Sequence, residues 1–164
     1  MISFFEQLSK EDQEKLIDAI PMITILIAGS EGKIDTQETS WATKLTEIRS
    51  YAHYHKLHTF YQNVGLHFQE KLDKLILSLP EDVGIRTRIL SDKLAELNDL
   101  LKRLRVEDGA MMYRSFTSFA KHVAKSSGGF LGFGSITNAE KKLIGLPMLT
   151  PIIHEFDEGE EEHK

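Results

Sequence analysis

Apolar residues recur at steps of three and four along most of this chain, and that spacing constrains the fold more than any other feature. The clearest run is Leu90, Leu94, Leu97, Leu101 and Leu104. Its alternating steps place all five side chains on one face of a helix. Strict alternation of apolar and polar residues, which would indicate half-buried strands, is almost absent. The sequence therefore predicts an all-α protein.

The first half of the chain should contain three helices. Ser9 can cap the first, and Pro21 predicts a short break or a new first turn within it. A long helix should run from Asp35 to about residues 56–59, and a third should cover residues 66 or 67 to 79. The face of the long helix that we expect to be buried consists of Trp41, Leu45, Ile48, Ala52 and His55.

The second half continues the helical pattern. Residues 78–81 predict a helix boundary with a capping box. The leucine run that follows predicts one helix, which packs lengthwise in a bundle or pairs between chains. A further helix should begin near Asp108, with Met112, Phe116, Phe119, Val123 and Ser127 aligned. A short helix should follow Thr137, and a final turn or helix should pass through residues 152–156.

Length and composition fit a single compact domain. The chain has 164 residues, of which 41% are hydrophobic, enough to bury a sizeable core. We assign residues 1–154 to this domain and residues 155–164 to an acidic, disordered tail, because six acids and one lysine give that tail the whole net charge of −5. The preceding residues balance 19 acids against 19 Lys and Arg. This balance disfavours a nucleic-acid partner.

Several classes of protein lack support in the sequence. There is no cysteine, which excludes disulfides and thiolate metal sites. No signal peptide or membrane span is recognisable, so we expect a cytoplasmic protein without direct membrane binding. No nucleophile elbow occurs, and the glycine-rich loop at 128–134 lacks nucleotide-binding order, so we expect no enzyme. Phe130 and Phe133 in that loop either pack on the core or form an exposed apolar tip.

A short phrase occurs twice, in residues 32–38 and 134–140. Each copy has a glycine, any residue, an isoleucine and then a cap-type residue, which is Asp35 in the first copy. A glutamate stands three residues after the cap, as Glu38 and Glu140. This spacing is that of a capping box, and the glycine allows a sharp chain reversal. The two halves of the chain therefore look like related helix-loop-helix units.

Each copy of the phrase follows an apolar helix that ends in small residues, at 28–32 and at 124–129. Together with the leucine-rich centre, this arrangement resembles the TerB-like family of tellurite-resistance proteins. The resemblance covers about residues 16–151. It implies an all-α bundle of two pseudo-repeated halves, a role in bacterial tellurite resistance and stress response, and no defining catalytic activity. We therefore expect a non-enzymatic interaction or sensing module with an unidentified protein partner, and homo-oligomer formation through the leucine run is a further option.

The alternative function is binding of a divalent cation. The resemblance implies metal sensing through acidic residues near the repeated turns, and the phrase matches the second half of an EF-hand loop. The first half does not match, since Ile27, Gly29 and Glu31 occupy its ligand positions. A site for Ca²⁺, Mg²⁺ or Mn²⁺ would need the two halves to approach one another. Its ligands would be Glu31, Asp35, Glu38 and Glu140.

Histidines offer a second metal hypothesis. His53, His55, His58 and His67 lie close together in the sequence, and the spacing of His55 and His58 lets two imidazoles share a helix face. Zinc would need further ligands, and no carboxylate has suitable spacing. Because His55 lies on the apolar stripe of its predicted helix, we expect it to be a buried, hydrogen-bonded residue.

Overall fold

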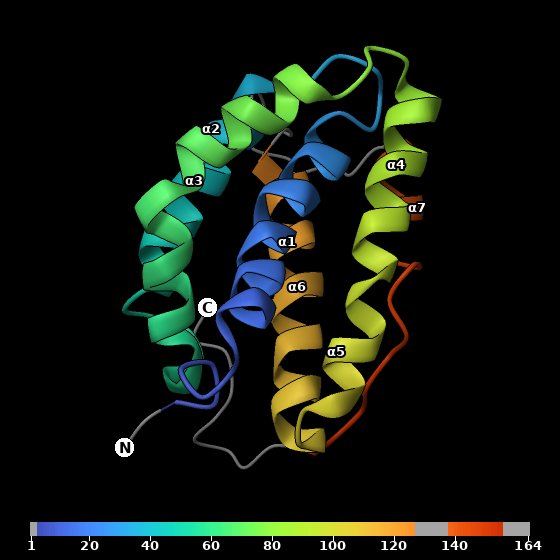
Figure 1. Cartoon of the computed structure of the whole chain (residues 1–164). Helices are drawn as coiled ribbons and strands as arrows, with labels where there is room; N and C mark the ends of the chain where they lie inside the picture. Colours follow the sequence, from blue (N-terminus) through green and yellow to red (C-terminus); the bar gives the residue numbers. More distant parts are fainter. Residues whose placement is uncertain (1–2, 127–137, 156–164) are drawn as a thin grey trace.

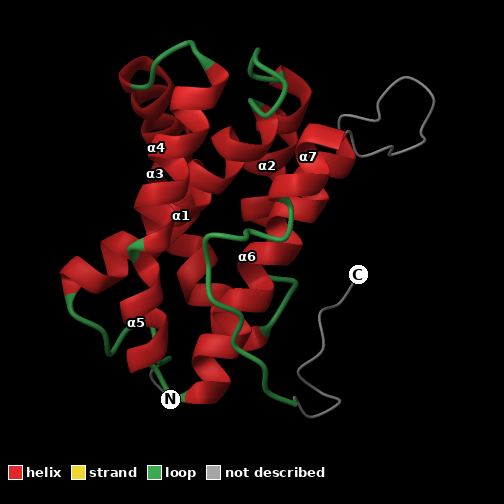
Figure 2. Cartoon of the chain, turned by 90° about the vertical axis from the view of Figure 1, so that its right-hand side faces the viewer, coloured by secondary structure: helices red, strands yellow, loops and turns green. Residues whose placement is uncertain are grey.

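The computed structural model describes residues 3–126 and 138–155, and every regular element in them is a helix (Figures 1 and 2). The all-α helical bundle is therefore confirmed, while the relation between its two halves stays a prediction. The helices in chain order are α1 (Lys10–Ala28), α2 (Thr36–Arg49), the short 3-10 helix η1 (His55–Leu57), α3 (His58–Ser78), α4 (Val83–Ala95), α5 (Leu97–Arg103), α6 (Val106–Ser126) and α7 (Asn138–Leu143).

Helix α1 is the centre of the bundle. It contacts α2, α3, α4, α5, α6 and α7, and Figure 1 shows it between α3 on one side and α4 on the other. Eleven of its 19 residues are buried, because its sequence is apolar on nearly every face from Ile23 to Ala28. A helix that is apolar all round is stable only when other elements surround it.

Pro21 does not interrupt α1, so the predicted break is wrong. The helix continues through Pro21, whose side chain is buried. Proline has no N–H, so the carbonyl of Ile17 loses its usual helical partner at a cost of about 3 kcal/mol. Burial of the surrounding residues outweighs this local cost. The start of α1 follows the prediction, because Ser9 Oγ accepts a hydrogen bond from the N–H of Asp12 at 3.1 Å.

Helix α2 is shorter than predicted and buries a different face. It ends at Arg49 rather than near residues 56–59, and turns follow. Trp41 and Ile48 are only half-buried. The buried residues of the helix are Glu38, Ala42, Leu45, Thr46 and Arg49. The apolar spacing misplaced this face because three of these five side chains are polar or charged.

Helix α3 begins earlier than predicted. It starts at His58, and its backbone leaves helical geometry at His67, where φ is −131° and ψ is 17°. The predicted start at residues 66–67 therefore marks a kink within a longer helix. Phe68 and Leu72 are buried as predicted.

The leucine run packs inside this chain. It is divided between α4 and α5, which Glu96 separates, so the prediction of one continuous helix is wrong. The cap of α4 is Asp82, whose Oδ1 accepts from the N–H of Ile85 at 2.9 Å, and not the predicted box at 78–81. Four leucines of the run are at most 3% exposed: Leu90, Leu94, Leu97 and Leu101. The run is thus part of the core.

Helix α6 follows its prediction, and helix α5 holds the segment that follows α7. Four aligned residues of α6, namely Met112, Phe116, Phe119 and Val123, are fully buried as predicted. The described residues 151–155 form neither a helix nor a turn, so the turn or helix predicted there is absent in that part. Asn98 of α5 fixes the residues just before them, because its Nδ2 donates to the carbonyl of Met148 at 3.0 Å and its Oδ1 accepts from the N–H of Thr150 at 2.8 Å.

Some predictions fall on residues that the structure does not describe. They concern the cap at Thr137, the two phenylalanines at 130 and 133, and the acidic tail from Phe156 onward. The short helix expected after Thr137 is present as α7.

Candidate functional site

The four acidic residues of the predicted cation site occupy different environments. Asp35 caps α2, and its Oδ1 accepts two backbone N–H groups of the first turn at 2.8 and 3.1 Å. Glu38 and Glu140 are each 2% exposed, whereas Glu31 is exposed. The predicted cap is confirmed, but the N–H of Asp35 donates to the carbonyl of Ala28 at 2.8 Å rather than to the carboxylate of a capping box.

These acids do not assemble into a ligand group. Within residues 3–126 and 138–155, no three His, Asp or Glu side chains gather in a way that could hold a metal ion. No three of Glu31, Asp35, Glu38 and Glu140 therefore meet. Divalent-cation binding stays a prediction.

A guanidinium group lies at the first repeated turn. Arg86 of α4 is 5% exposed, and its Nη2 donates to the carbonyl of Gly29 at 2.7 Å and to the carbonyl of Gly32. Gly32 has φ of 117°, in the left-handed region that favours glycine. A Cβ at Gly29 would lie 2.6 Å from Nη2, so only glycine permits this approach. Because α1 has no basic residue in its last turn, Arg86 supplies the positive charge that the helix end favours.

The histidines divide between surface and core. The rings of His55 and His58 lie 5.1 Å apart, and burial together with the charge of His55 lowers the pKa of His58. His67 is exposed and lies 3.7 Å from the carboxylate of Glu70. His53 is only 5% exposed. The prediction of a buried His55 is therefore wrong, since His55 is exposed and His53 takes the buried position.

A buried polar network surrounds Arg49. Its Nη1 donates to the hydroxyl of Tyr61 and to the carbonyl of Ser115, both at 2.9 Å, and its Nη2 donates to Ser118 Oγ at 2.9 Å. Ser115 Oγ lies 2.6 Å from the Tyr61 hydroxyl and 2.9 Å from His53 Nε2. The serine and histidine resemble a catalytic pair, but Ser115 is 0% exposed. No substrate reaches it, and the network stabilises the core.

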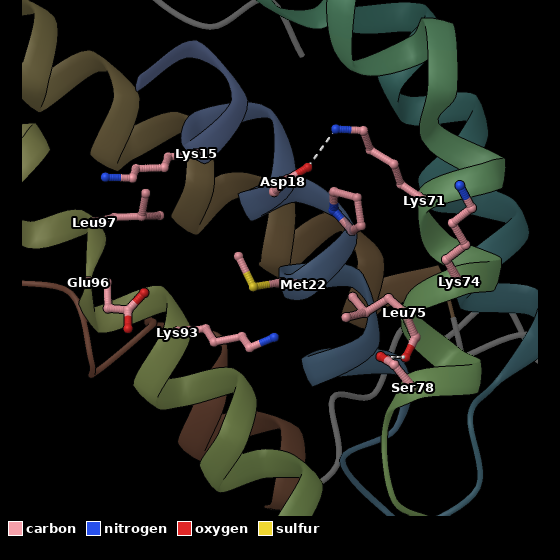
Figure 3. A pocket seen from close by; sticks show the side chains of 11 residues that line it. Lys15, Asp18, Met22, Lys71, Lys74, Leu75, Ser78, Lys93, Glu96 and Leu97 are labelled. Carbon is pink, nitrogen blue, oxygen red and sulfur yellow. Dashed lines mark hydrogen bonds and ion pairs between the residues drawn. The ribbon is translucent and has the colours of Figure 1, made fainter. Parts of the chain in front are cut away.

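A groove of about 580 Å³ lies over α1, between α3 and the α4–α5 pair (Figure 3). Its apolar surface comes from Pro21 and Met22 of α1, Leu75 of α3 and Leu97 of α5. Helices α3 and α4 are joined by a short loop, yet each packs mainly on other helices, and both contact α1. The outer face of α1 is consequently left as the floor of the groove.

Charged side chains form the rim of the groove. Lys71 Nζ lies 2.6 Å from Asp18 Oδ1 and 2.7 Å from Glu14 Oε2. Desolvation lowers the pKa of Lys71, but the hydrogen bonds and charges of Asp18 and Glu14 outweigh that effect and raise the pKa overall. Lys71 therefore stays protonated and compensates Asp18. The other charged residues of the rim are Lys15, Lys74, Lys93 and Glu96.

The remaining rim lysines are weakly engaged. Lys15 lies 3.4 Å from Glu11, and Lys74 lies 3.0 Å from Glu70; all four side chains are more than half exposed. Exposed pairs of this kind contribute about 0–1 kcal/mol. Lys93 makes no ion pair within the described part of the chain. Lys93 is thus the lysine of the rim that a ligand can pair with directly.

Sequence reasoning missed this groove. The sequence did carry a signal, because lysines stand next to apolar residues at helical spacing. These are Lys71 and Lys74 near Leu75, and Lys93 near Leu97. Such lysines usually belong to a solvated helix face. Only the separation of α3 from α4, which the sequence does not reveal, brings the two sets together.

Comparison with known proteins adds no relative from which a function could be transferred. No protein-family model, no curated protein and no solved structure matches this chain. Among the described helices, none has the length and apolar character needed to cross a membrane. The candidate function therefore depends on the geometry of the chain itself.

Proposed function

We propose that this protein is a non-enzymatic interaction or sensing module that binds a molecule reversibly in the groove between α1, α3 and the α4–α5 pair. One observation carries the proposal: an apolar floor and a charged rim occur together in a groove of about 580 Å³. This size and this mixture of surfaces are typical of sites for small molecules. The bacterial stress context is part of the proposal through the resemblance to the TerB-like family.

The polar groups of the groove support binding rather than catalysis. Ser78 Oγ donates to the carbonyl of Leu75 at 2.8 Å, with no base beside it, and Asp18 is compensated by Lys71. A nucleophile needs a general base within hydrogen-bond reach. The serine and histidine that do meet, Ser115 and His53, are buried elsewhere.

The absence of cysteine from the chain allows a direct test with one environment-sensitive dye. The label is placed in the groove wall through Ser78→Cys and, as a matched control, on an exposed face of α2 through Ser40→Cys. Both proteins are titrated with dodecyl compounds whose head groups are anionic, neutral or cationic. We expect at least one compound to change the emission of the groove label saturably while the control label does not respond.

The proposal is wrong if none of the three compounds changes the groove label. It is equally wrong if both labels respond alike, because that result indicates non-specific association. Circular dichroism at each end point checks that the compounds leave the bundle folded.

The divalent-cation alternative has its own test. The observation that favours it is the nearly complete burial of Glu38 and Glu140, two of its four predicted ligands. A bound cation should raise the melting temperature in a concentration-dependent way. The shift with Ca²⁺, Mg²⁺ or Mn²⁺ should disappear in Glu38→Ala and Glu140→Ala, provided that both variants stay helical. If none of these cations raises the melting temperature of the wild type, this alternative is rejected.

A further inference from the structure

We propose that the groove binds the anion of a medium-chain fatty acid, with its alkyl chain on the apolar floor and its carboxylate at the lysine rim. This inference rests on the proposed function, because it names the class of ligand for the same groove.

The floor suits a flexible alkyl chain. Met22 and Leu75 are half-buried; Met22 of α1 lies on the floor of the groove and Leu75 of α3 on one wall, as Figure 3 shows. Leu97 is 3% exposed and closes the third side. Methionine is flexible and polarizable, so it adapts to ligands of irregular shape. The surface offers apolar contact along the groove and no hydrogen-bond pattern that would select a polar ligand body.

The rim selects a negative head group. Four lysines and two acids line the groove, but three of the lysines are engaged: Lys71 pairs with Asp18 and Glu14, Lys15 with Glu11, and Lys74 with Glu70. Lys93 makes no ion pair in the part of the chain that the structure describes, so it is the lysine that a ligand can pair with directly. The exposed pairs of Lys15 and Lys74 are weak and exchange readily. A carboxylate accepts strong hydrogen bonds from ammonium groups. Lys93, within a lining that holds more lysines than acids, therefore favours an anionic head group.

The volume suits a ligand of this size. At roughly 30 Å³ per non-hydrogen atom, the groove of about 580 Å³ holds roughly 19 such atoms. A fatty acid anion with about 12 carbons and one carboxylate fits this space.

The experiment measures binding of dodecanoate to the full chain by isothermal titration calorimetry, below the concentration at which dodecanoate forms micelles. We expect saturable binding with one site. Octanoate should bind at least tenfold more weakly, because each buried methylene changes affinity by about fourfold. Dodecanol should bind at least fivefold more weakly than dodecanoate, and dodecyltrimethylammonium at least tenfold more weakly.

Variants locate the site. Lys93→Met removes the rim charge and keeps an apolar stem, and it should weaken dodecanoate binding about three- to tenfold while leaving dodecanol unchanged. The matched control is Lys102→Met, an exposed lysine of α5 outside the groove, which should bind like the wild type. Met22→Trp fills the floor and should abolish binding. If circular dichroism shows that this variant is unfolded, Leu75→Trp serves the same purpose from the opposite wall.

The outcomes separate the ligand class from the function of the groove. If dodecanol or dodecyltrimethylammonium binds as tightly as dodecanoate and Met22→Trp removes that binding, the fatty-acid proposal is overturned while the groove keeps its proposed function. If no dodecyl compound binds, both proposals fail. If neither Lys93→Met nor Met22→Trp changes the affinity for dodecanoate, the site lies elsewhere and the inference is overturned. Co-sedimentation with phosphatidylglycerol vesicles, blocked by the same variants, overturns it in favour of a lipid surface.

Discussion

Replacing Arg86 with alanine should destabilise the fold far more than a surface arginine substitution would. The change removes the donor of the hydrogen bond to the buried carbonyl of Gly29, worth about 1.5–3 kcal/mol because the donor is charged. The half-buried carbonyl of Gly32 gains water in exchange, so that loss is about 1 kcal/mol. Loss of the positive charge at the end of α1 adds about 0.5–1 kcal/mol.

These contributions give an expected loss of about 3–5 kcal/mol in the free energy of unfolding. The assay is urea denaturation followed by circular dichroism, and thermal unfolding should show a fall of about 6–20 °C in the melting temperature. Arg88→Ala is the matched control, because Arg88 lies exposed on the same helix and should change stability by less than about 0.5 kcal/mol. Arg86→Lys should recover about half of the loss, since the ammonium group keeps the positive charge but lacks the several N–H donors of the planar guanidinium. A loss below about 1 kcal/mol in Arg86→Ala would refute the reasoning.

Three further predictions follow from buried groups. The free energy of unfolding should fall as the pH drops below about 6.5, because burial and the charge of His55 lower the pKa of His58 in the folded state and protons then bind preferentially to the unfolded chain. Urea unfolding at two pH values should show that this free energy depends less on pH in His58→Gln than in the wild type. An unchanged pH dependence in the variant contradicts the assignment to His58. Ser115→Ala should cost about 2–3 kcal/mol in chemical denaturation, because it removes the hydroxyl that lies 2.6 Å from the Tyr61 hydroxyl and 2.9 Å from His53 Nε2 in the core. A loss below about 1 kcal/mol would count against the network. Leu94→Ala should cost about 3–5 kcal/mol with no change in mass by light scattering, whereas a fall in mass would show that the leucine run pairs between chains.

The helical fold was predictable because its dominant signal is local. The spacing of Leu90, Leu94 and Leu101 in the α4–α5 pair, and of Phe116 and Phe119 in α6, depends only on which side of a helix each residue occupies. All five side chains are buried. Periodicity therefore identified the core-facing sides of α4, α5 and α6.

The errors arose where tertiary contacts outweigh local preferences. Arg49 counts as a surface residue in any apolar pattern, yet its guanidinium lies in the core because hydroxyl and carbonyl groups from α3 and α6 accept its hydrogen bonds. Pro21 counts as a break, yet the buried surroundings of α1 hold the helix together. Neither residue carries a local signal for its partners, which lie many positions away in the sequence.

The candidate site shows the same division between local and distant information. Asp35 was correctly predicted as a cap because a cap depends on the next three residues. The groove could not be predicted, because it needs Lys15, Lys74 and Lys93 from three helices whose relative placement is set by packing on α1. Arg86 escaped notice for the same reason, since its acceptors lie 57 and 54 residues earlier in the chain.

The central place of α1 also has a consequence for synthesis on the ribosome. α1 is complete at residue 28, but α6, one of its main covering helices, is complete only at residue 126. At about 5–20 residues per second, translation of the intervening segment takes about 5–20 s. During that interval a helix whose last residues, 23–28, are apolar on nearly every face has no finished bundle to enter. Nascent chains of this protein should therefore depend on chaperone binding to α1 more than on protection of any later helix.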